Sequence, residues 1–306
     1  LPNNKPNDVL NARLFEVINL DYPGLEKVKS YYEANEYYYA AYELLKYYRN
    51  RSDINNPNIN LINPSITAFE QNIADQALDS RFYVRNFKES VDANGNEVYY
   101  SFKKDGKIDW SYSGMTDQEF KSQIHRHQWM LPQAKAYRVN QNENYISSWI
   151  TVYNDWLNTF PCPEGTVDKD AVQWYGLQPA ERVLDQINIM PHFIQSTNFT
   201  PEWLSTFLTA LADEVECIRK NYFTDGSNIY VTQVQAVTTA GMLMPEFKNA
   251  TEWLNEGSLK ISEQVTAQFL ADGVQVELDP SYHIGVVNDL YSIYKLAQLN
   301  NKLSLF

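Results

Sequence analysis

The chain has 306 residues, 44% of them hydrophobic, and a formal net charge of −13. This length and apolar content exclude a disordered chain and are enough for one large domain or two ordinary ones. The acidic balance excludes nucleic acid and a membrane surface as main partners, since both need a basic surface. No apolar run approaches the roughly 20 residues of a membrane span.

Turn-forming residues are scarce, with only 11 glycines and 13 prolines beside 22 tyrosines. An all-β fold needs many such residues, and we therefore expect a mostly helical protein. Cys162 and Cys217 are too few for a disulfide framework and lack metal-ligand spacing, and the sequence leaves their pairing open. No cofactor motif is identifiable. Because the chain begins with Leu1 and not Met, we expect a processed protein that is exported, periplasmic or secreted.

Two units are predicted, an N-terminal helical segment over residues 1–52 and a larger helical domain over residues 53–306. The first contains apolar stripes at helical spacing. The second opens with an Asn- and Pro-rich loop, followed by a helix over residues 66–78. Residues 82–102 predict one short β-hairpin, because strand-like runs flank a turn that contains Asn-Gly and Gly-Asn.

From residue 116 onward, amphipathic helices follow one another with short connections, which make neighbouring helices antiparallel. Stacked helical hairpins of this kind bend into a solenoid or close into an α/α toroid. The predicted helices cover residues 117–129, 143–157, 178–190, 201–222, 228–243 and 247–270, and a last one begins after Pro280.

Aromatic residues recur near the ends of these helices. An aromatic ring offers a flat apolar face to a sugar, so the group favours a carbohydrate-binding cleft, although each single ring can equally serve the core. A basic run at residues 121–138 is a second candidate site, for an anion, or simply a solvated face. The aromatic residues are Trp129, Tyr137, Trp149, Trp156, Trp174, Tyr175, Trp203, Tyr222 and Trp253.

The last predicted helix carries Tyr282 and His283 in its first turn. Asp279 is a suitable cap and Pro280 suits the first helical position. A tyrosine at a helix start can serve in proton transfer, or both side chains can simply pack against the preceding residues 274–278.

Six segments, taken in order and spacing, resemble the N-terminal helical domain of the heparinase II/III family of polysaccharide lyases, and most of all its heparan-sulfate-cleaving heparinase III branch. The resemblance implies an incomplete α/α toroid followed by a C-terminal β-sandwich, which we expect to be absent from this chain. The segments are KIDW (107–110), HRHQW (125–129), WYGLQPAERV (174–183), YFTDGSNIYVTQVQAV (222–237), MPEFKNATEWL (244–254) and ELDPSYH (277–283).

The implied chemistry is β-elimination, in which the C5 proton of a uronic acid is removed and the oxygen at C4 is expelled. By resemblance, Asn228 neutralises the uronate carboxylate and Tyr282 is the catalytic acid or base. An alternative for Asn228 is a helix cap. Substrate-binding candidates in the matching segments are Arg126, His127, Gln178, Arg182 and His283.

Some residues in or near the matching segments have other interpretations or depart from the family pattern. Arg182 lies near Glu181 and Asp185 and could serve in surface ion pairing instead. His192, within an apolar stretch, is expected to be buried and satisfied. Ile229 follows Asn228 where family members often carry histidine, and the family's further catalytic histidine is expected outside this chain, since no histidine follows His283.

The expected substrate is sparsely sulfated heparan sulfate, because the acidic net charge disfavours a more highly sulfated polymer. Two other functions stay open. One is an inverting glycoside hydrolase on an α/α toroid, with two carboxylates roughly 6.5–9.5 Å apart, for which Asp109, Glu181 and Asp225 are candidates. The other is a glycan-binding helical module without catalysis.

Overall fold

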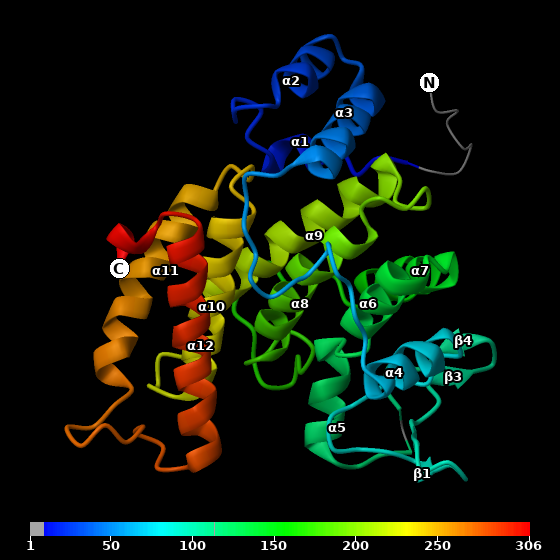
Figure 1. Cartoon of the computed structure of the whole chain (residues 1–306), viewed down its shortest axis with the longest axis vertical. Helices are drawn as coiled ribbons and strands as arrows, with labels where there is room; N and C mark the ends of the chain where they lie inside the picture. The colour runs from blue at the N-terminus through cyan, green and yellow to red at the C-terminus, as the bar shows by residue number, and fades with distance from the viewer. Residues whose placement is uncertain (1–8, 113) are drawn as a thin grey trace.

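Helices form most of the regular structure in the computed structural model, which describes residues 9–112 and 114–306 (Figure 1). Among these residues, no helix is both long enough and apolar enough to cross a bilayer. The helices are α1 Leu14–Val17, α2 Glu26–Glu33, α3 Tyr37–Asn50, α4 Ala68–Leu78, α5 Gln118–Gln123, α6 Met130–Asn140, α7 Glu143–Thr159, α8 Gln178–Phe193, α9 Pro201–Lys220, α10 Asn228–Leu243, α11 Ala250–Ala267 and α12 Pro280–Leu299, with short 3₁₀ turns at Ile124–Arg126 and Leu303–Leu305.

The helices are arranged as an open arc in two layers. The inner helices α4, α6, α8, α10 and α12 pack side by side in that order, and α7, α9 and α11 return along the outside. Helices α6 and α7, α8 and α9, and α10 and α11 form the hairpins of this arc. The prediction of stacked antiparallel helical hairpins is confirmed.

The N-terminal helices α1–α3 cover one end of α9, at the top of Figure 1. Their apolar side chains, including Leu14 and Leu44, belong to the same core as Leu208 and Leu211 of α9. The domain boundary after residue 52 stays a prediction, with one continuous core on both sides of it.

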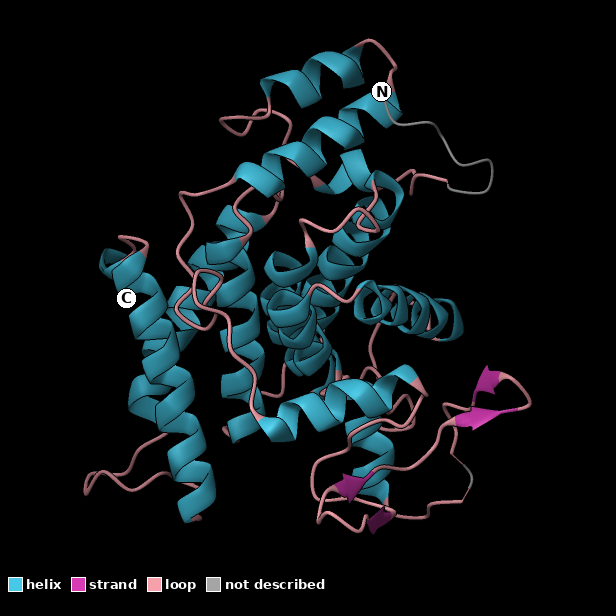
Figure 2. Ribbon diagram, turned by 45° about the vertical axis from the view of Figure 1, so that its right-hand side comes forward, coloured by secondary structure: helices cyan, strands magenta, loops and turns pink. Residues whose placement is uncertain are grey.

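The segment before α5 contains two small hairpins where one was expected (Figure 2). Strand β1 Ser90–Val91 pairs with β2 Glu97–Val98, and β3 Lys103–Lys104 pairs with β4 Lys107–Ile108. The second hairpin turns at Asp105 and Gly106, both with positive φ. Asp-Gly is a favoured pair for such a tight turn, so this pair could have predicted the second hairpin.

Helix α6 was also missed. The predicted helix over residues 117–129 ends early, because His127 adopts a left-handed conformation with φ 60°. The next helix, α6, begins at Met130 and carries Pro132 in its first turn, where proline is tolerated. The charged and polar residues of α6 suggested a basic surface run and masked its helical character.

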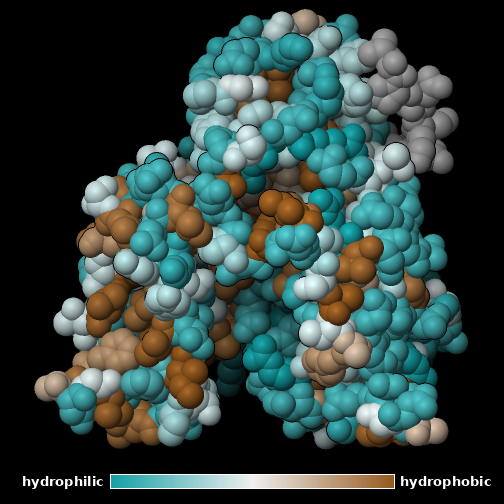
Figure 3. Space-filling view, in the orientation of Figure 1, coloured by the Kyte–Doolittle hydropathy of each residue, from teal (hydrophilic) through white to brown (hydrophobic). Residues whose placement is uncertain are grey.

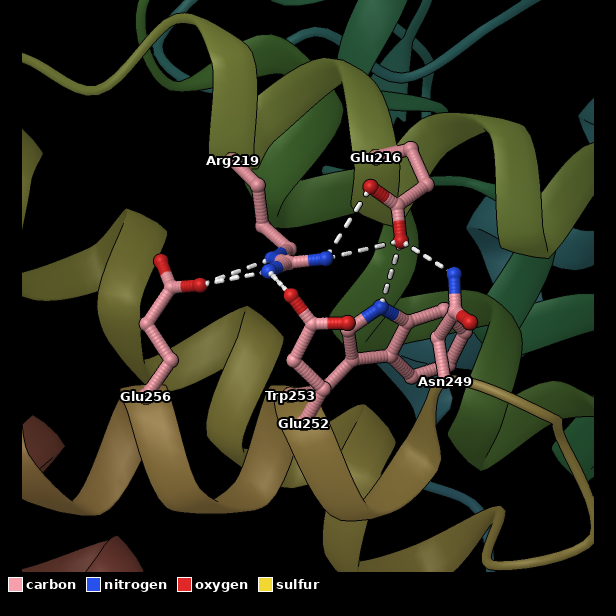
Figure 4. Close-up of polar contacts among 6 residues, drawn as sticks. All are labelled: Glu216, Arg219, Asn249, Glu252, Trp253 and Glu256. Carbon is pink, nitrogen blue, oxygen red and sulfur yellow. Dashed lines mark hydrogen bonds and ion pairs between the residues drawn. The ribbon is translucent and has the colours of Figure 1, made fainter.

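An ion-pair cluster joins α9 to α11 on the outer layer (Figure 4). The Arg219 guanidinium contacts Glu216 on its own helix and Glu252 and Glu256 on α11. Glu216 also accepts a hydrogen bond of 2.7 Å from the Trp253 indole. Charge-assisted hydrogen bonds of this kind fix the two helices in register.

Glycines allow α10 and α11 to approach closely. A Cβ atom on Gly241 would lie 2.5 Å from the backbone nitrogen of Leu254 and 2.8 Å from the Ala250 carbonyl oxygen. One on Gly257 would lie 2.2 Å from Thr238 Oγ1. Since the atoms facing Gly241 are backbone, the helices themselves must separate to admit a larger residue there.

We therefore expect Gly241→Ala to lower the free energy of unfolding by about 1–3 kcal/mol, the usual cost of overpacking. Chemical denaturation of both proteins measures the difference. Gly285→Ala on α12 is the matched control, because a Cβ there meets no atom within 4 Å and alanine favours a helix by up to about 1 kcal/mol. A Gly241→Ala variant as stable as the wild type would contradict this account of the interface.

Candidate active site

A cleft of about 930 Å³ opens at the lower edge of the molecule, between α5 and α8 on one side and α10 and α12 on the other (Figure 3). Hydrophilic side chains cover much of the surface around this hollow. Four of the residues predicted from the sequence line it, namely Arg126, Gln178, Asn228 and Tyr282. Three others, His127, Arg182 and His283, do not.

Asn228 is the first residue of α10. The cap position belongs to Ser227, so the interpretation of Asn228 as a cap is wrong. Its backbone nitrogen donates to Glu277 Oε2 at 2.9 Å. Its side-chain amide has no hydrogen-bond partner among the described residues and borders the cleft. The amide is therefore available for a ligand.

Tyr282 lies in the first turn of α12, as predicted. Asp279 caps this helix by accepting from the backbone nitrogens of Ser281 at 2.7 Å and Tyr282 at 3.2 Å. The Tyr282 side chain is 48% exposed, and its hydroxyl has no partner within the described part of the chain. The predicted cap is confirmed, and it holds the tyrosine at the mouth of the cleft.

A network of side chains holds the starts of α10 and α12 together. Gln268 donates to the Gly226 carbonyl oxygen at 2.9 Å, just before α10. Gln275 donates to Gln268 at 3.0 Å and to Glu277 at 3.1 Å. Because Glu277 binds the backbone of Asn228, this network positions Asn228 relative to the segment that leads into Tyr282.

Residues one and two turns further along both helices also line the cleft and were missed in the sequence. They are Thr232 and Gln235 on α10, and Val286 and Asp289 on α12. Thr232 donates to Asp289 at 3.0 Å and so links the two helices. Burial raises the pKa of Asp289 to about 6. Spacings of four and seven residues from Asn228 and Tyr282 could have identified them.

Arg126 and Gln178 form the opposite wall. Arg126 Nε donates to Gln178 Oε1 at 3.3 Å, and its Nη2 lies 3.2 Å from Glu119. Gln178 in turn donates to the Val172 carbonyl oxygen at 2.9 Å. Arg85, from the loop after α4, brings a second guanidinium to the cleft and was not predicted.

Carboxylates also line this side of the cleft. Asp185 and Glu181 both belong to α8. Burial, followed by the neighbouring Glu181 charge, raises the pKa of Asp185 to about 8. At neutral pH Asp185 is therefore mostly protonated, which reduces the negative charge that an acidic ligand meets.

Two expected substrate-binding residues lie in the core instead. Arg182 is fully buried and pairs with Glu214 at 3.1 Å, so it cannot contact a polysaccharide; surface ion pairing is equally wrong for it. His127 is also fully buried, among the rings of Trp129, Tyr153 and Trp156. Burial lowers the pKa of His127 well below its usual value.

His283 points back toward the preceding loop. Its Nδ1 accepts from the Gln275 backbone nitrogen at 3.3 Å, and its ring packs edge-on against Phe269. The alternative that both side chains pack against the preceding residues is therefore correct for His283 and wrong for Tyr282. His192 is buried and bonds the Asn188 carbonyl oxygen at 2.8 Å, as predicted.

Most of the aromatic residues expected to line a carbohydrate-binding cleft lie elsewhere in the structure. Tyr175 alone of the nine predicted rings lines the cleft, and Phe223 joins it. The seven tryptophans are buried, because large apolar surfaces at helix ends complete the core between layers. Of the carboxylates suggested for a hydrolase, Glu181 lines the cleft, whereas Asp109 and Asp225 do not. The described residues contain no cluster of His, Cys, Asp and Glu suited to a metal ion.

Comparisons with known proteins agree on one family. The model described as Heparinase II/III N-terminus matches residues 14–306. A heparin-sulfate lyase of Bacteroides thetaiotaomicron is 49% identical over 302 residues, which cover 98% of this chain and 42% of that protein. A heparin-sulfate lyase of Bacteroides stercoris is 33% identical, over 95% of this chain and 44% of that protein.

Solved structures give the same result. A crystal structure of heparinase III superposes with a TM-score of 0.93 at 47% identity, over 97% of this chain and 45% of the other. A heparan sulfate lyase from Pedobacter heparinus gives a TM-score of 0.81 at 29% identity, over 96% of this chain and 45% of the other. The chain thus spans less than half the length of the relatives it matches, and its helical arc is the fold of their matching part. The chain belongs to the heparinase II/III family.

Proposed function

We propose that this chain is the helical part of a polysaccharide lyase that cleaves heparan sulfate by β-elimination at a uronic acid. The observation that carries the proposal is the convergence of Asn228 and Tyr282 on one cleft, each with a polar group that has no partner among the described residues. The names of the similar proteins support the same reaction. The proposal concerns the complete protein, in which the family resemblance implies a further catalytic histidine.

The two residues have distinct roles in this mechanism. The uronate carboxylate opposes loss of the neighbouring C5 proton, since negative charge develops beside it. The Asn228 amide donates hydrogen bonds to this carboxylate and stabilises the developing charge. Tyr282 removes the C5 proton or protonates the departing O4, and its exposed position at the cleft mouth allows it to reach the sugar.

The opposite wall binds the acidic groups of the polymer. Arg126 is nearly buried and held by Gln178 and Glu119, so its orientation is fixed before substrate arrives. A guanidinium binds carboxylate or sulfate through paired hydrogen bonds. Glu119 and Glu181 on the same wall disfavour a densely sulfated polymer, which supports a sparsely sulfated substrate.

We also propose that the protein acts in the periplasm or outside the cell, where a polysaccharide of this kind is accessible. Cell fractionation tests the location. Recovery of the protein only from the cytoplasm would contradict it.

The complete protein should convert heparan sulfate to an unsaturated product that absorbs ultraviolet light. Tyr282→Phe keeps the ring but removes the acid or base, and we expect kcat to fall by about two to four orders of magnitude with unchanged thermal stability. Tyr291→Phe is the control, because Tyr291 is exposed on the same helix outside the cleft. A saturated product would indicate a hydrolase, and binding without product would indicate a glycan-binding module.

Asn228→Ala should lower kcat by roughly 10²- to 10³-fold, the usual effect of removing one donor to a developing charge. The hydrogen bonds of Asn228 to the described residues are made by its backbone, so the variant should unfold at the wild-type temperature. Initial rates on heparan sulfate at saturating substrate measure the effect. Near-normal kcat would remove Asn228 from the mechanism.

Asp185 should make substrate binding depend on pH. Its pKa of about 8 means that it is neutral below that pH and becomes negative above it. Between about pH 6 and pH 9 we expect KM for heparan sulfate to rise roughly fivefold more in the wild type than in Asp185→Asn, as about 1 kcal/mol of repulsion requires. The exposed Asp79→Asn is the control. Identical KM profiles for wild type and Asp185→Asn would contradict the effect.

A further inference from the structure

The two cysteines of the chain lie far apart in sequence but meet in the fold. Cys162 belongs to the long connection between α7 and α8, and Cys217 lies in the last two turns of α9. Each thiol shifts the pKa of the other, so the two side chains lie near each other, and both are free thiols in the structure.

Backbone geometry supports this contact. Cys162 Sγ lies 3.5 Å from the carbonyl oxygen of Asp213, one helical turn before Cys217. A side chain on an α-helix leans back over the preceding turn, so the Cys217 thiol occupies the space beside that carbonyl group. Pro161 and Pro163 flank Cys162 and restrict its backbone, which keeps its thiol directed at α9.

The same face of α9 already holds the connection by hydrogen bonds. Asn221, one turn after Cys217, accepts from the Val167 backbone nitrogen at 2.8 Å and donates to the Cys217 carbonyl oxygen at 2.9 Å. The far end of this connection, Tyr175–Leu177, lines the cleft. A bond between the cysteines would therefore fix the near end of a segment that forms one cleft wall.

We propose that Cys162 and Cys217 form an intramolecular disulfide under oxidising thiol–disulfide conditions and thereby attach the connection of residues 160–177 to α9. This inference is independent of the proposed lyase function. Cys162 Sγ lies beside the Asp213 carbonyl oxygen, and Asn221 contacts both Cys217 and the connection, so little rearrangement is needed to join the two sulfur atoms.

The different exposure of the two cysteines determines which of them reacts first. Cys162 is partly exposed, whereas Cys217 is buried. With oxidised glutathione as oxidant, the Cys162 thiolate attacks one glutathione sulfur and releases one glutathione thiolate, leaving a mixed disulfide. Cys217 then loses its proton and attacks Cys162 Sγ, which releases the second glutathione. Two cysteine thiols are oxidised by two electrons, and one glutathione disulfide is reduced to two thiols.

The reduced pair sets the rate of the first step. Before oxidation, the Cys162 thiol lowers the pKa of Cys217. The hydrogen bond to Cys217, followed by burial, raises the pKa of Cys162. The first step should therefore be the slow one and should accelerate with rising pH.

The test is to incubate the folded complete protein with oxidised glutathione, alkylate all free thiols under denaturing conditions and map the peptides by mass spectrometry. We expect the peptides containing Cys162 and Cys217 to be joined. The oxidised protein should also unfold about 5 °C or more above the reduced protein, because the bond closes a long loop. It should resist trypsin after the exposed Lys169. Alkylation of both cysteines as free thiols would overturn the proposal.

Single variants test the order of steps. Cys217→Ser removes the second thiol, so one glutathione should remain attached to Cys162. Cys162→Ser should leave buried Cys217 unmodified, and its unfolding temperature should not respond to oxidant. A stable glutathione adduct on Cys162 in the wild type, with Cys217 still free, would also contradict the disulfide, since it would show that the sulfurs do not meet.

Discussion

The buried charge of Arg182 is the constraint on which one side of the cleft depends. Its guanidinium is fully buried, pairs with Glu214 and stacks on the Trp156 and Trp174 rings at 4.2 Å and 4.8 Å. Its Nη1 also donates to the carbonyl oxygens of His125 and Gln173, each at 2.8 Å. A buried charge that loses its partners destabilises a protein by several kcal/mol, so these segments are firmly held.

The contacts of Arg182 determine where the backbone of one cleft wall lies. His125 immediately precedes Arg126, and Gln173 lies two residues before Tyr175, so the carbonyl contacts fix the backbone that carries two cleft residues. Arg182 thus contributes to the site through the segments that it holds and has no contact with the cleft itself. The other side of the cleft has its own support, in which the side chains of Gln268, Gln275 and Glu277 connect the starts of α10 and α12.

Local sequence features predicted most of the helices, though not α6, and the placement of Tyr282. Asp279 and Pro280 mark the start of α12 because capping depends on neighbouring residues only. Asn228 and Tyr282 required the family resemblance, and their meeting in one cleft depends on packing between α10 and α12 that no local pattern specifies. Arg182 shows most clearly what a local pattern cannot predict. The acidic residues near it in sequence suggested a surface role, whereas its partner, Glu214, belongs to the next helix. The same reason applies to the two cysteines, whose contact across the fold their spacing could not indicate.

In the proposed mechanism, Asn228 and Tyr282 act on one uronic acid. A crystal structure of the complete Tyr282→Phe variant with a heparan sulfate oligosaccharide tests it directly, because the variant should bind substrate without cleaving it. We predict that the uronate carboxylate lies about 2.7–3.2 Å from the Asn228 amide, with C5 of the same sugar facing the ring at position 282. An oligosaccharide bound elsewhere on the protein, or in the cleft with its uronate carboxylate turned away from Asn228, would contradict the account.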